Sequence, residues 1–173
     1  MITTIGGPIG SGKTTVSDAI AEKFGFTHIS AGLIFREMAN EKGVTLEEFS
    51  KLAEENHEFD RELDKQQIEL AKKAENAVID GRLSGLLIDA DLKVWLKAPL
   101  ETRARRVSGR EGKDYMAALE DIRKRGDSEL KRYKEIYDID LRDLTPYDIV
   151  INTDPFSADE VIGIMEKIVS YSR

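Results

Sequence analysis

The sequence of 173 residues contains no cysteine, one tryptophan and four prolines. Without cysteine the chain can form neither disulfides nor thiolate metal sites. No apolar run approaches the roughly 20 residues that a membrane-spanning helix requires. The first residues follow a strand pattern and show no basic and then apolar leader. We therefore expect a cytoplasmic protein that does not associate with membranes.

The remaining composition is typical of one globular domain. Apolar residues make up 40% of the chain and charged residues 34%, which is enough to build one core with small polar appendages. The net charge of −7 argues against a nucleic acid polymer as the main ligand, because phosphate backbones repel an acidic protein.

The arginines are concentrated in one region of this acidic chain. Eight of the twelve lie between Arg103 and Arg142. The guanidinium group presents a rigid fork of donors that suits phosphate oxygens, so the concentration favours a small and highly charged ligand. Because aspartate and glutamate are interleaved with these arginines, a solvated surface of salt bridges fits the spacing equally well.

Residues 7–14 match the phosphate-binding pattern G-x-x-x-x-G-K-[ST]. A short strand is expected before them, over 1–5, and an amphipathic helix after them, over 14–24. Backbone N–H groups of such a loop converge on an oxyanion at the positive end of the helix. Lys13 can then reach the outer phosphates, and the Thr14 hydroxyl can bind Mg²⁺. The alternative is a chance match in a glycine turn, against which the flanking strand and helix argue.

Four further strands are expected, each separated from the last by a helical segment. They are residues 26–29, 77–80, 92–96 and 147–152. Strands that alternate with helices predict an α/β fold in which a five-stranded parallel sheet is flanked by helices.

Polar residues follow two of these strands, at the sheet edge where α/β proteins bind ligands. Ser30 and Gly32 follow the second strand, and Arg36 lies one turn into the next helix, although an ordinary surface charge is the alternative for Arg36. Asp80 ends the third strand, where a carboxylate holds Mg²⁺ in phosphate-loop proteins. Arg82 follows it on the same side.

Residues 36–60 differ in character from the rest. They are polar and acidic, and Leu46, Phe49 and Leu52 form only a thin apolar stripe, which predicts a loosely packed helical flap. On the next helix Asp60 and Asp64 share one face, since they are four residues apart. These two acids either bind donor groups of a ligand or are simply solvated.

Arginines recur on two successive helices of the arginine-rich region. The first helix opens near Ala98-Pro99, and a second is expected over 116–137, where Gly126 could produce a bend. Helical spacing places two sets of side chains on common faces; they are Arg103, Arg106 and Arg110 on the first helix, and Arg125, Glu129 and Arg132 on the second. This arrangement predicts a lid that closes over phosphates, and the alternative is an exposed charged hairpin.

Several segments together give the chain its resemblance to a known family. They are GPIGSGKTT at 7–15, SAGLIFREMA at 30–39, VIDGRLSG at 78–85, VWLKAPLETRARRV at 94–107, RGDSELKRY at 125–133 and YDIVINT at 147–153. Over essentially its whole length the chain resembles nucleoside monophosphate kinases, and within them the archaeal type of cytidylate kinase. The D-G-R element and the R-x-x-x-E-x-x-R-Y run narrow the resemblance most. Gly126 departs from the family pattern, where an acidic residue is expected.

The resemblance implies a P-loop NTPase fold and transfer of the γ-phosphoryl group of ATP, with Mg²⁺, to CMP and dCMP. It implies one kinase domain over 1–173, divided into a core (1–35, 61–108 and 138–173), an acceptor-binding flap (36–60) and a lid (109–137). We expect a monomer whose partners are these small molecules. Two rivals stay open, namely a kinase for another acceptor such as UMP, AMP or a small metabolite, and a regulatory nucleotide switch.

The family positions also imply a role for each of several individual residues. The residues implied to bind ATP are Gly7, Pro8, Ile9, Gly10, Ser11, Gly12, Lys13, Thr14, Thr15 and Arg106. Those implied to bind the acceptor are Ser30, Gly32, Arg36, Asp64, Arg82, Arg125, Glu129 and Arg132. The implied metal-binding residues are Thr14 and Asp80, and the implied catalytic residues are Lys13, Arg110, Arg125 and Arg132.

Overall fold

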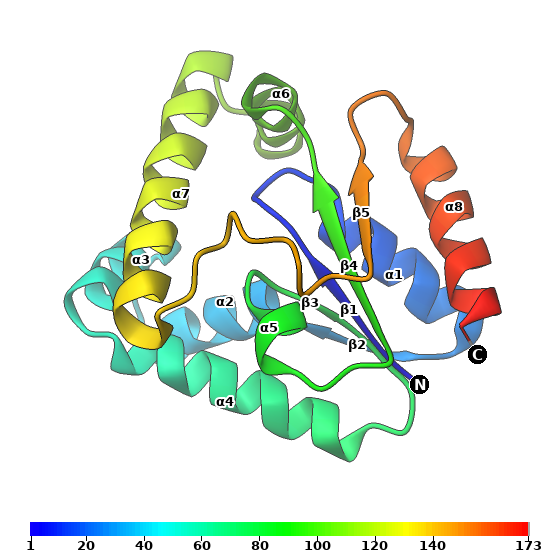
Figure 1. The fold of residues 1–173 in the computed structure, drawn as a ribbon. Helices are drawn as coiled ribbons and strands as arrows, with labels where there is room; N and C mark the ends of the chain where they lie inside the picture. Colours follow the sequence, from blue (N-terminus) through cyan, green and yellow to red (C-terminus); the bar gives the residue numbers. More distant parts are fainter. Residues whose placement is uncertain (173) are drawn as a thin grey trace.

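A computed structural model describes residues 1–172 and contains one five-stranded sheet (Figure 1). Residue 173, the last of the predicted core, lies outside the described part. The strands are β1 (Ile2–Gly6), β2 (Thr27–Ser30), β3 (Ala77–Asp80), β4 (Leu92–Lys97) and β5 (Ile149–Asn152). Their order is β2-β3-β1-β4-β5, and every neighbouring pair is parallel. The predicted α/β fold with a five-stranded parallel sheet is confirmed.

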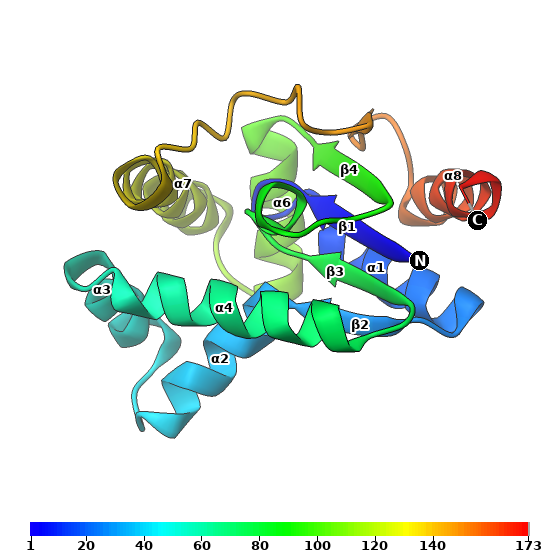
Figure 2. The same ribbon diagram turned by 60° about the horizontal axis from the view of Figure 1, so that its bottom comes forward.

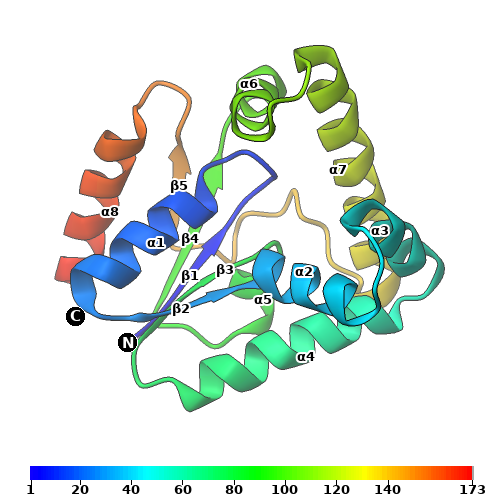
Figure 3. The ribbon, with the colours of Figure 1, turned by 180° about the vertical axis from the view of Figure 1, so that it is seen from behind.

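Helices cover both faces of the sheet. They are α1 (Lys13–Phe24), α2 (Ala31–Glu41), α3 (Leu46–Glu55), α4 (Glu58–Lys73), α5 (Ser84–Leu87), α6 (Leu100–Glu111), α7 (Tyr115–Tyr137) and α8 (Ala158–Tyr171). Figure 2 and Figure 3 show α1 and α8 side by side against one face, with α2 and α4 against the other. All four residues of β3 are buried, as expected for a parallel strand that is covered on both faces.

The local signals for helix ends agree with the structure in most places. Capping boxes form at Thr45 with Glu48 and at Ser157 with Glu160, as the spacing predicts. Pro99 is the residue before α6 rather than part of its first turn. Gly126 does not interrupt α7, which is helical from Tyr115 to Tyr137.

The fifth strand begins two residues later than the predicted start at 147. Tyr147 is used instead as a packing residue, and its ring lies 5.0 Å from that of Trp95 on β4, centroid to centroid. An aromatic contact of this kind buries a large apolar area, so tertiary packing determines the local backbone here.

The predicted flap (36–60) is packed through one residue of its expected apolar stripe. Phe49 is fully buried, with its ring centroid 4.7 Å from that of Phe35 and 5.1 Å from that of Phe59. Leu46 and Leu52, by contrast, are each 37% exposed. The stripe is therefore as thin as predicted, but Phe49 is buried by partners from α2 and α4, which spacing within α3 alone does not reveal.

Candidate active site

The phosphate-binding loop (7–14) leaves the central strand β1 and enters α1 at the carboxyl edge of the sheet. Gly7 and Gly10 have backbone φ angles of 147° and 79°, which residues with a side chain rarely adopt. A Cβ at Gly7 would lie 2.3 Å from the Leu96 carbonyl oxygen, and one at Gly10 would lie 2.8 Å from the Arg103 carbonyl oxygen. The loop is thus wedged between the end of β4 and α6, which fixes its shape.

Lys13 is folded back over this loop. Its Nζ donates a hydrogen bond of 3.2 Å to the Pro8 carbonyl. Burial, followed by the nearby positive charge of Arg82, lowers the pKa of Lys13 to about 7, and Asp80 and Glu129 oppose this effect. An anion that enters the loop would favour the charged form, so the site is electrostatically prepared for phosphate.

Asp80 lies beside the start of α1 and is 3% exposed. The Thr14 hydroxyl donates to its Oδ2 over 2.8 Å, and His28 Nε2 lies 3.3 Å from its Oδ1. Burial works against ionisation, but hydrogen bonds from His28, Ser30 and Thr14 outweigh it and hold the pKa of Asp80 below its usual range. The pKa of His28 is raised, and the hydrogen bond to Asp80 is the main cause.

The pair of oxygens on Thr14 and Asp80 fits the chemistry of a Mg²⁺ site. Mg²⁺ prefers oxygen ligands and is usually bound by one or two protein groups together with waters and substrate phosphates. Within the described residues no group of three or more histidine, aspartate or glutamate side chains is arranged as a metal site. Thr14 and Asp80 stay the predicted protein ligands of Mg²⁺.

Helix α6 joins the loop to the end of β5. Arg103 donates to the carbonyls of Ile9 and Ala98, each over 3.1 Å. Arg106 donates to the Thr153 hydroxyl over 2.9 Å and to the Thr153 carbonyl over 2.8 Å. Sequence reasoning missed Thr153, because a threonine after a strand carries no signal of its own.

A pocket of about 370 Å³ lies beside the loop, between α6 and α8. Its lining includes Gly12, Arg106, Arg110, Thr153 and Phe156. This volume lies within the range of small-molecule sites. The two arginines predicted to contact ATP or its transferred phosphate thus line one pocket, although Arg110 is largely exposed and pairs with Glu111.

Three predicted acceptor residues lie together after β2. A Cβ at Gly32 would be 3.7 Å from Ser30 Oγ and 3.8 Å from an Arg36 guanidinium nitrogen. Arg82, after β3, forms an ion pair with Glu129 of α7, and both side chains are mostly buried. That ion pair connects α7, in the predicted lid (109–137), to the carboxyl edge of the sheet.

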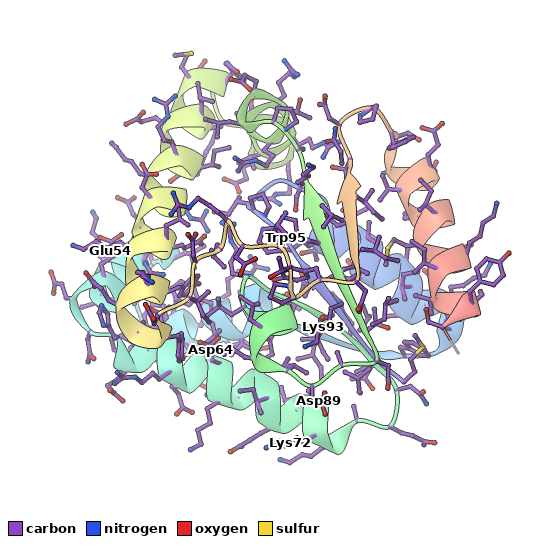
Figure 4. The ribbon with its side chains drawn as sticks, in the orientation of Figure 1. Glu54, Asp64, Lys72, Asp89, Lys93 and Trp95 are labelled. Atoms are coloured by element: carbon purple, nitrogen blue, oxygen red, sulfur yellow. The ribbon has the colours of Figure 1, made fainter. Side chains whose placement is uncertain are left out.

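The paired acids of α4 are buried, so their interpretation as solvated residues is wrong. Asp60 is 3% exposed and binds Arg132, with Oδ2 accepting from Nε over 2.9 Å. Asp64 is 6% exposed and accepts from the Tyr137 hydroxyl over 2.8 Å. Figure 4 shows Asp64 on α4 beside the C-terminal end of α7. Burial raises the pKa of Asp64 to about 7.

The phosphate-binding loop and the Asp80 carboxylate thus lie at one edge of the sheet, and sequence comparisons identify the family. The family model described as "Cytidylate kinase-like family" matches residues 2–155. The chain belongs to the cytidylate kinase-like family.

Curated relatives support this membership over nearly the whole length of the chain. A cytidylate kinase of Methanobrevibacter smithii is 48% identical over 165 residues, which cover 95% of this chain and 96% of the relative. A cytidylate kinase of Methanocaldococcus jannaschii is 49% identical, covering 98% of this chain and 97% of the relative. The resemblance to archaeal cytidylate kinases is therefore confirmed, and this cytidylate kinase-like chain is a phosphotransferase.

Solved structures of more distant proteins share the fold. A shikimate kinase of Acinetobacter baumannii, in complex with shikimate, has a TM-score of 0.58 at 18% identity and covers 99% of this chain and 93% of its own. An uncharacterized protein of Eubacterium ventriosum has a TM-score of 0.71 at 21% identity, with 98% of each chain covered. These matches bear out the P-loop fold of the cytidylate kinase-like chain.

One predicted site residue of this cytidylate kinase-like chain lies apart from the loop. Arg125 is 39% exposed, and its Nη1 lies 3.9 Å from Asp121 of its own helix. Between α7 and the loop is a second pocket of about 270 Å³, which Arg82, Arg123 and Glu129 help to line. Sequence reasoning missed Arg123. This arginine does not share the helical spacing of Arg125, Glu129 and Arg132, so the sequence contained no signal for it.

Proposed function

We propose that this chain transfers the γ-phosphoryl group of Mg-ATP to CMP and dCMP, giving CDP or dCDP and ADP. The observation that carries the proposal is the Thr14–Asp80 pair beside the phosphate loop, in a chain about 48% identical to curated cytidylate kinases. The 370 Å³ pocket beside the loop supports a nucleotide site there, and Arg82 and Glu129 line a second hollow between the loop and α7.

The donor nucleotide occupies the loop side of the site. Lys13 and the loop amides bind the ATP phosphates, and the pocket lined by Arg106 and Arg110 takes the adenosine part. Thr14 and Asp80 hold Mg²⁺ with the phosphates, with the low pKa of Asp80 keeping its carboxylate ionised. Bound Mg²⁺ supplies neutralisation of phosphate charge during transfer.

The acceptor nucleotide occupies the side formed by β2, β3 and the lid. Ser30, Arg36 and Arg82 bind its phosphate and base, while Glu129 lies within reach of its sugar. An acceptor phosphate oxygen attacks the γ-phosphorus, and the bond to the bridging oxygen of ADP breaks, so no covalent enzyme intermediate is required. Arginines of the lid offset the charge that spreads over the transferred group.

Lid closure has a second role, which is to keep water from the γ-phosphorus. Arg110 and Arg125 lie on exposed surface, so they reach the transferred group only when the end of α6 and the start of α7 move toward the loop. Arg106 and Arg132 keep their contacts with Thr153 and Asp60 during this motion. A rigid core with a movable lid therefore fits the division of the chain into core, flap and lid.

The test is the initial rate of diphosphate formation with Mg-ATP and each of CMP, dCMP, UMP, AMP, GMP and dTMP. We expect the highest kcat/KM with CMP, dCMP next to it, and no transfer by the Lys13→Ala variant. Preference for another monophosphate would contradict the assigned base and leave the assigned reaction, phosphoryl transfer to a monophosphate, in place. ATP hydrolysis that no monophosphate stimulates would favour the nucleotide switch.

The proposal extends to the physical state of the protein. No helix of residues 1–172 is both long and apolar enough to cross a membrane. A cytoplasmic monomer remains the expectation. Sedimentation equilibrium of the purified chain at the concentrations of the kinetic assay tests the monomer, and a dimer there would contradict it.

A further inference from the structure

We propose that Asp60 is a positioning residue, which holds one edge of the Arg132 guanidinium so that the remaining donors face the acceptor phosphate. This inference rests on the proposed function, because it assigns Arg132 a phosphate ligand. It concerns Asp60, a residue of α4 that lies 72 residues from its partner in the sequence.

The Asp60–Arg132 pair has the geometry of a side-on ion pair. Arg132 Nε donates to Asp60 Oδ2 over 2.9 Å, and Nη2 lies 3.4 Å from Oδ1. The side chains of Arg132 and Asp60 are only 11% and 4% exposed. Removing one partner of a buried ion pair leaves an uncompensated charge, which is strongly destabilising. Arg132 therefore stays on Asp60 while ligands come and go.

The remaining donors of Arg132 are only partly used. Its Nη1 donates to Ser128 Oγ over 2.8 Å, so three of the five guanidinium N–H groups are engaged. The other two have no hydrogen-bond acceptor among residues 1–172. An arginine with one edge fixed and two donors left over is prepared to bind a phosphate in a defined orientation.

The direction of these donors follows from the neighbouring turn of α7. Glu129 precedes Arg132 by one turn and pairs with Arg82 at the end of β3, beside the loop. Glu129 and Arg82 also line one pocket together with Pro8 of the loop, so this face of α7 lies beside the loop. Arg132 thus lies on the face of α7 that points to the carboxyl edge of the sheet.

A second contact connects this arginine to the flap. Ser128, which accepts from Arg132, itself donates to Glu54 Oε1 of α3 over 2.7 Å. Asp60 at the start of α4 and Glu54 at the end of α3 therefore hold the arginine from two sides. An arginine fixed in this way loses little freedom when it binds a ligand, so binding energy is retained for catalysis.

The experiment is a double-mutant cycle on Asp60→Asn and Arg132→Ala, using the monophosphate that gives the highest rate with the wild type. Asp60→Asn is expected to lower kcat about tenfold or more and to leave the KM for ATP unchanged, because a misplaced phosphate ligand impairs transfer. In the Arg132→Ala background the same substitution is expected to change kcat by less than about twofold.

Tyr137→Phe is the matched control, since it removes a different side-chain contact between α4 and α7. It breaks the Asp64–Tyr137 hydrogen bond and leaves Asp60–Arg132 in place. We expect it to lower the melting temperature without a comparable loss of kcat. An equal loss of kcat in Tyr137→Phe would mean that Asp60 only holds the helices together, which would overturn the proposal.

Arg132→Lys keeps the test decisive if Asp60→Asn does not fold. Lysine can still pair with Asp60. Its single ammonium group cannot, however, donate hydrogen bonds to the carboxylate and to a phosphate with the fixed geometry of a planar guanidinium. We expect a stable variant with kcat reduced about tenfold or more. Wild-type kcat in Arg132→Lys, or an undiminished effect of Asp60→Asn in the Arg132→Ala background, contradicts the positioning role.

The two proposals fail in different ways. If the wild type transfers phosphate to none of the monophosphates, the proposed function falls and the positioning role falls with it. If the wild type is active and Asp60→Asn has unchanged kinetics, the proposed function stands and only the role of Asp60 is overturned.

Discussion

The Thr153 hydroxyl lies 3.1 Å from the Ser11 carbonyl oxygen, 142 residues earlier in the chain. The same hydroxyl accepts a hydrogen bond from Arg106. Thr153 is 2% exposed, so water does not compete for either contact. The end of β5 therefore supports the phosphate-binding loop from behind and holds α6 in place.

This support predicts the behaviour of Thr153→Val. Valine matches threonine in shape but leaves the buried Ser11 carbonyl without its donor and the half-buried Arg106 with one acceptor fewer. An unsatisfied buried group costs about 1–3 kcal/mol in unfolding free energy. We expect the KM for ATP to rise and the KM for the acceptor to stay constant. Urea unfolding and steady-state kinetics measure both effects. Thr102→Val, which removes an exposed hydrogen bond to Asp154, serves as the control and should be near wild type.

Asp80→Asn tests the metal site. Asparagine keeps the shape but removes the charge that the low pKa of Asp80 maintains. Loss of a supporting ligand typically lowers metal affinity by about 10–100-fold, so the Mg²⁺ concentration for half-maximal rate should rise by that factor. A titration of activity with Mg²⁺ at saturating nucleotides gives the value. An unchanged Mg²⁺ requirement would remove Asp80 from the metal site.

Arg125→Ala tests the lid. Among residues 1–172, Arg125 makes a single long ion pair, with Asp121 on its own helix, so alanine should leave the fold intact. If the lid brings this arginine to the transferred group, kcat should fall by at least about tenfold, a conservative lower bound for arginines with this role. Circular dichroism confirms the fold of the variant. Wild-type turnover would show that Arg125 belongs to the solvated surface.

Asp64 predicts a pH dependence of stability. Its folded pKa of about 7 is above the unfolded value, so the folded state binds the proton more tightly. The associated stability is complete below the unfolded pKa and is lost as the pH rises through about 7. The side chain of the Asp64→Asn variant does not titrate, so this variant should not show that loss of stability.

The measurement compares urea unfolding of the wild type and Asp64→Asn. Between about pH 5 and about pH 8 the wild type should lose about 2–3 kcal/mol more stability than the variant. A constant difference between the two proteins across this range would show that Asp64 has an ordinary pKa despite its burial.

Features encoded by neighbouring residues were predictable from the sequence. The phosphate-binding loop, the strand that ends at Asp80 and the capping boxes each depend on a few consecutive residues, and the structure contains all of them. The parallel sheet followed because five short apolar segments alternate with helical ones.

Features that depend on distant partners were not predictable. Asp60 has the same local sequence signature as any exposed acid, and only the docking of α7 makes it a buried partner of Arg132. Phe49 belongs to an aromatic cluster supplied by two other helices. Thr153 matters because its neighbours in space are 47 and 142 residues away in the chain.

The order of strands in the sheet has a consequence for synthesis of the chain. β1 is made first, yet it is the central strand, and both of its neighbours, β3 and β4, are translated more than seventy residues later. Pairing between such distant segments is slow, and an unpaired apolar strand is prone to aggregate. The loop acquires its support from Thr153 later still. We therefore expect the loop to reach its full nucleotide affinity only after β5 has been synthesised and has paired with β4.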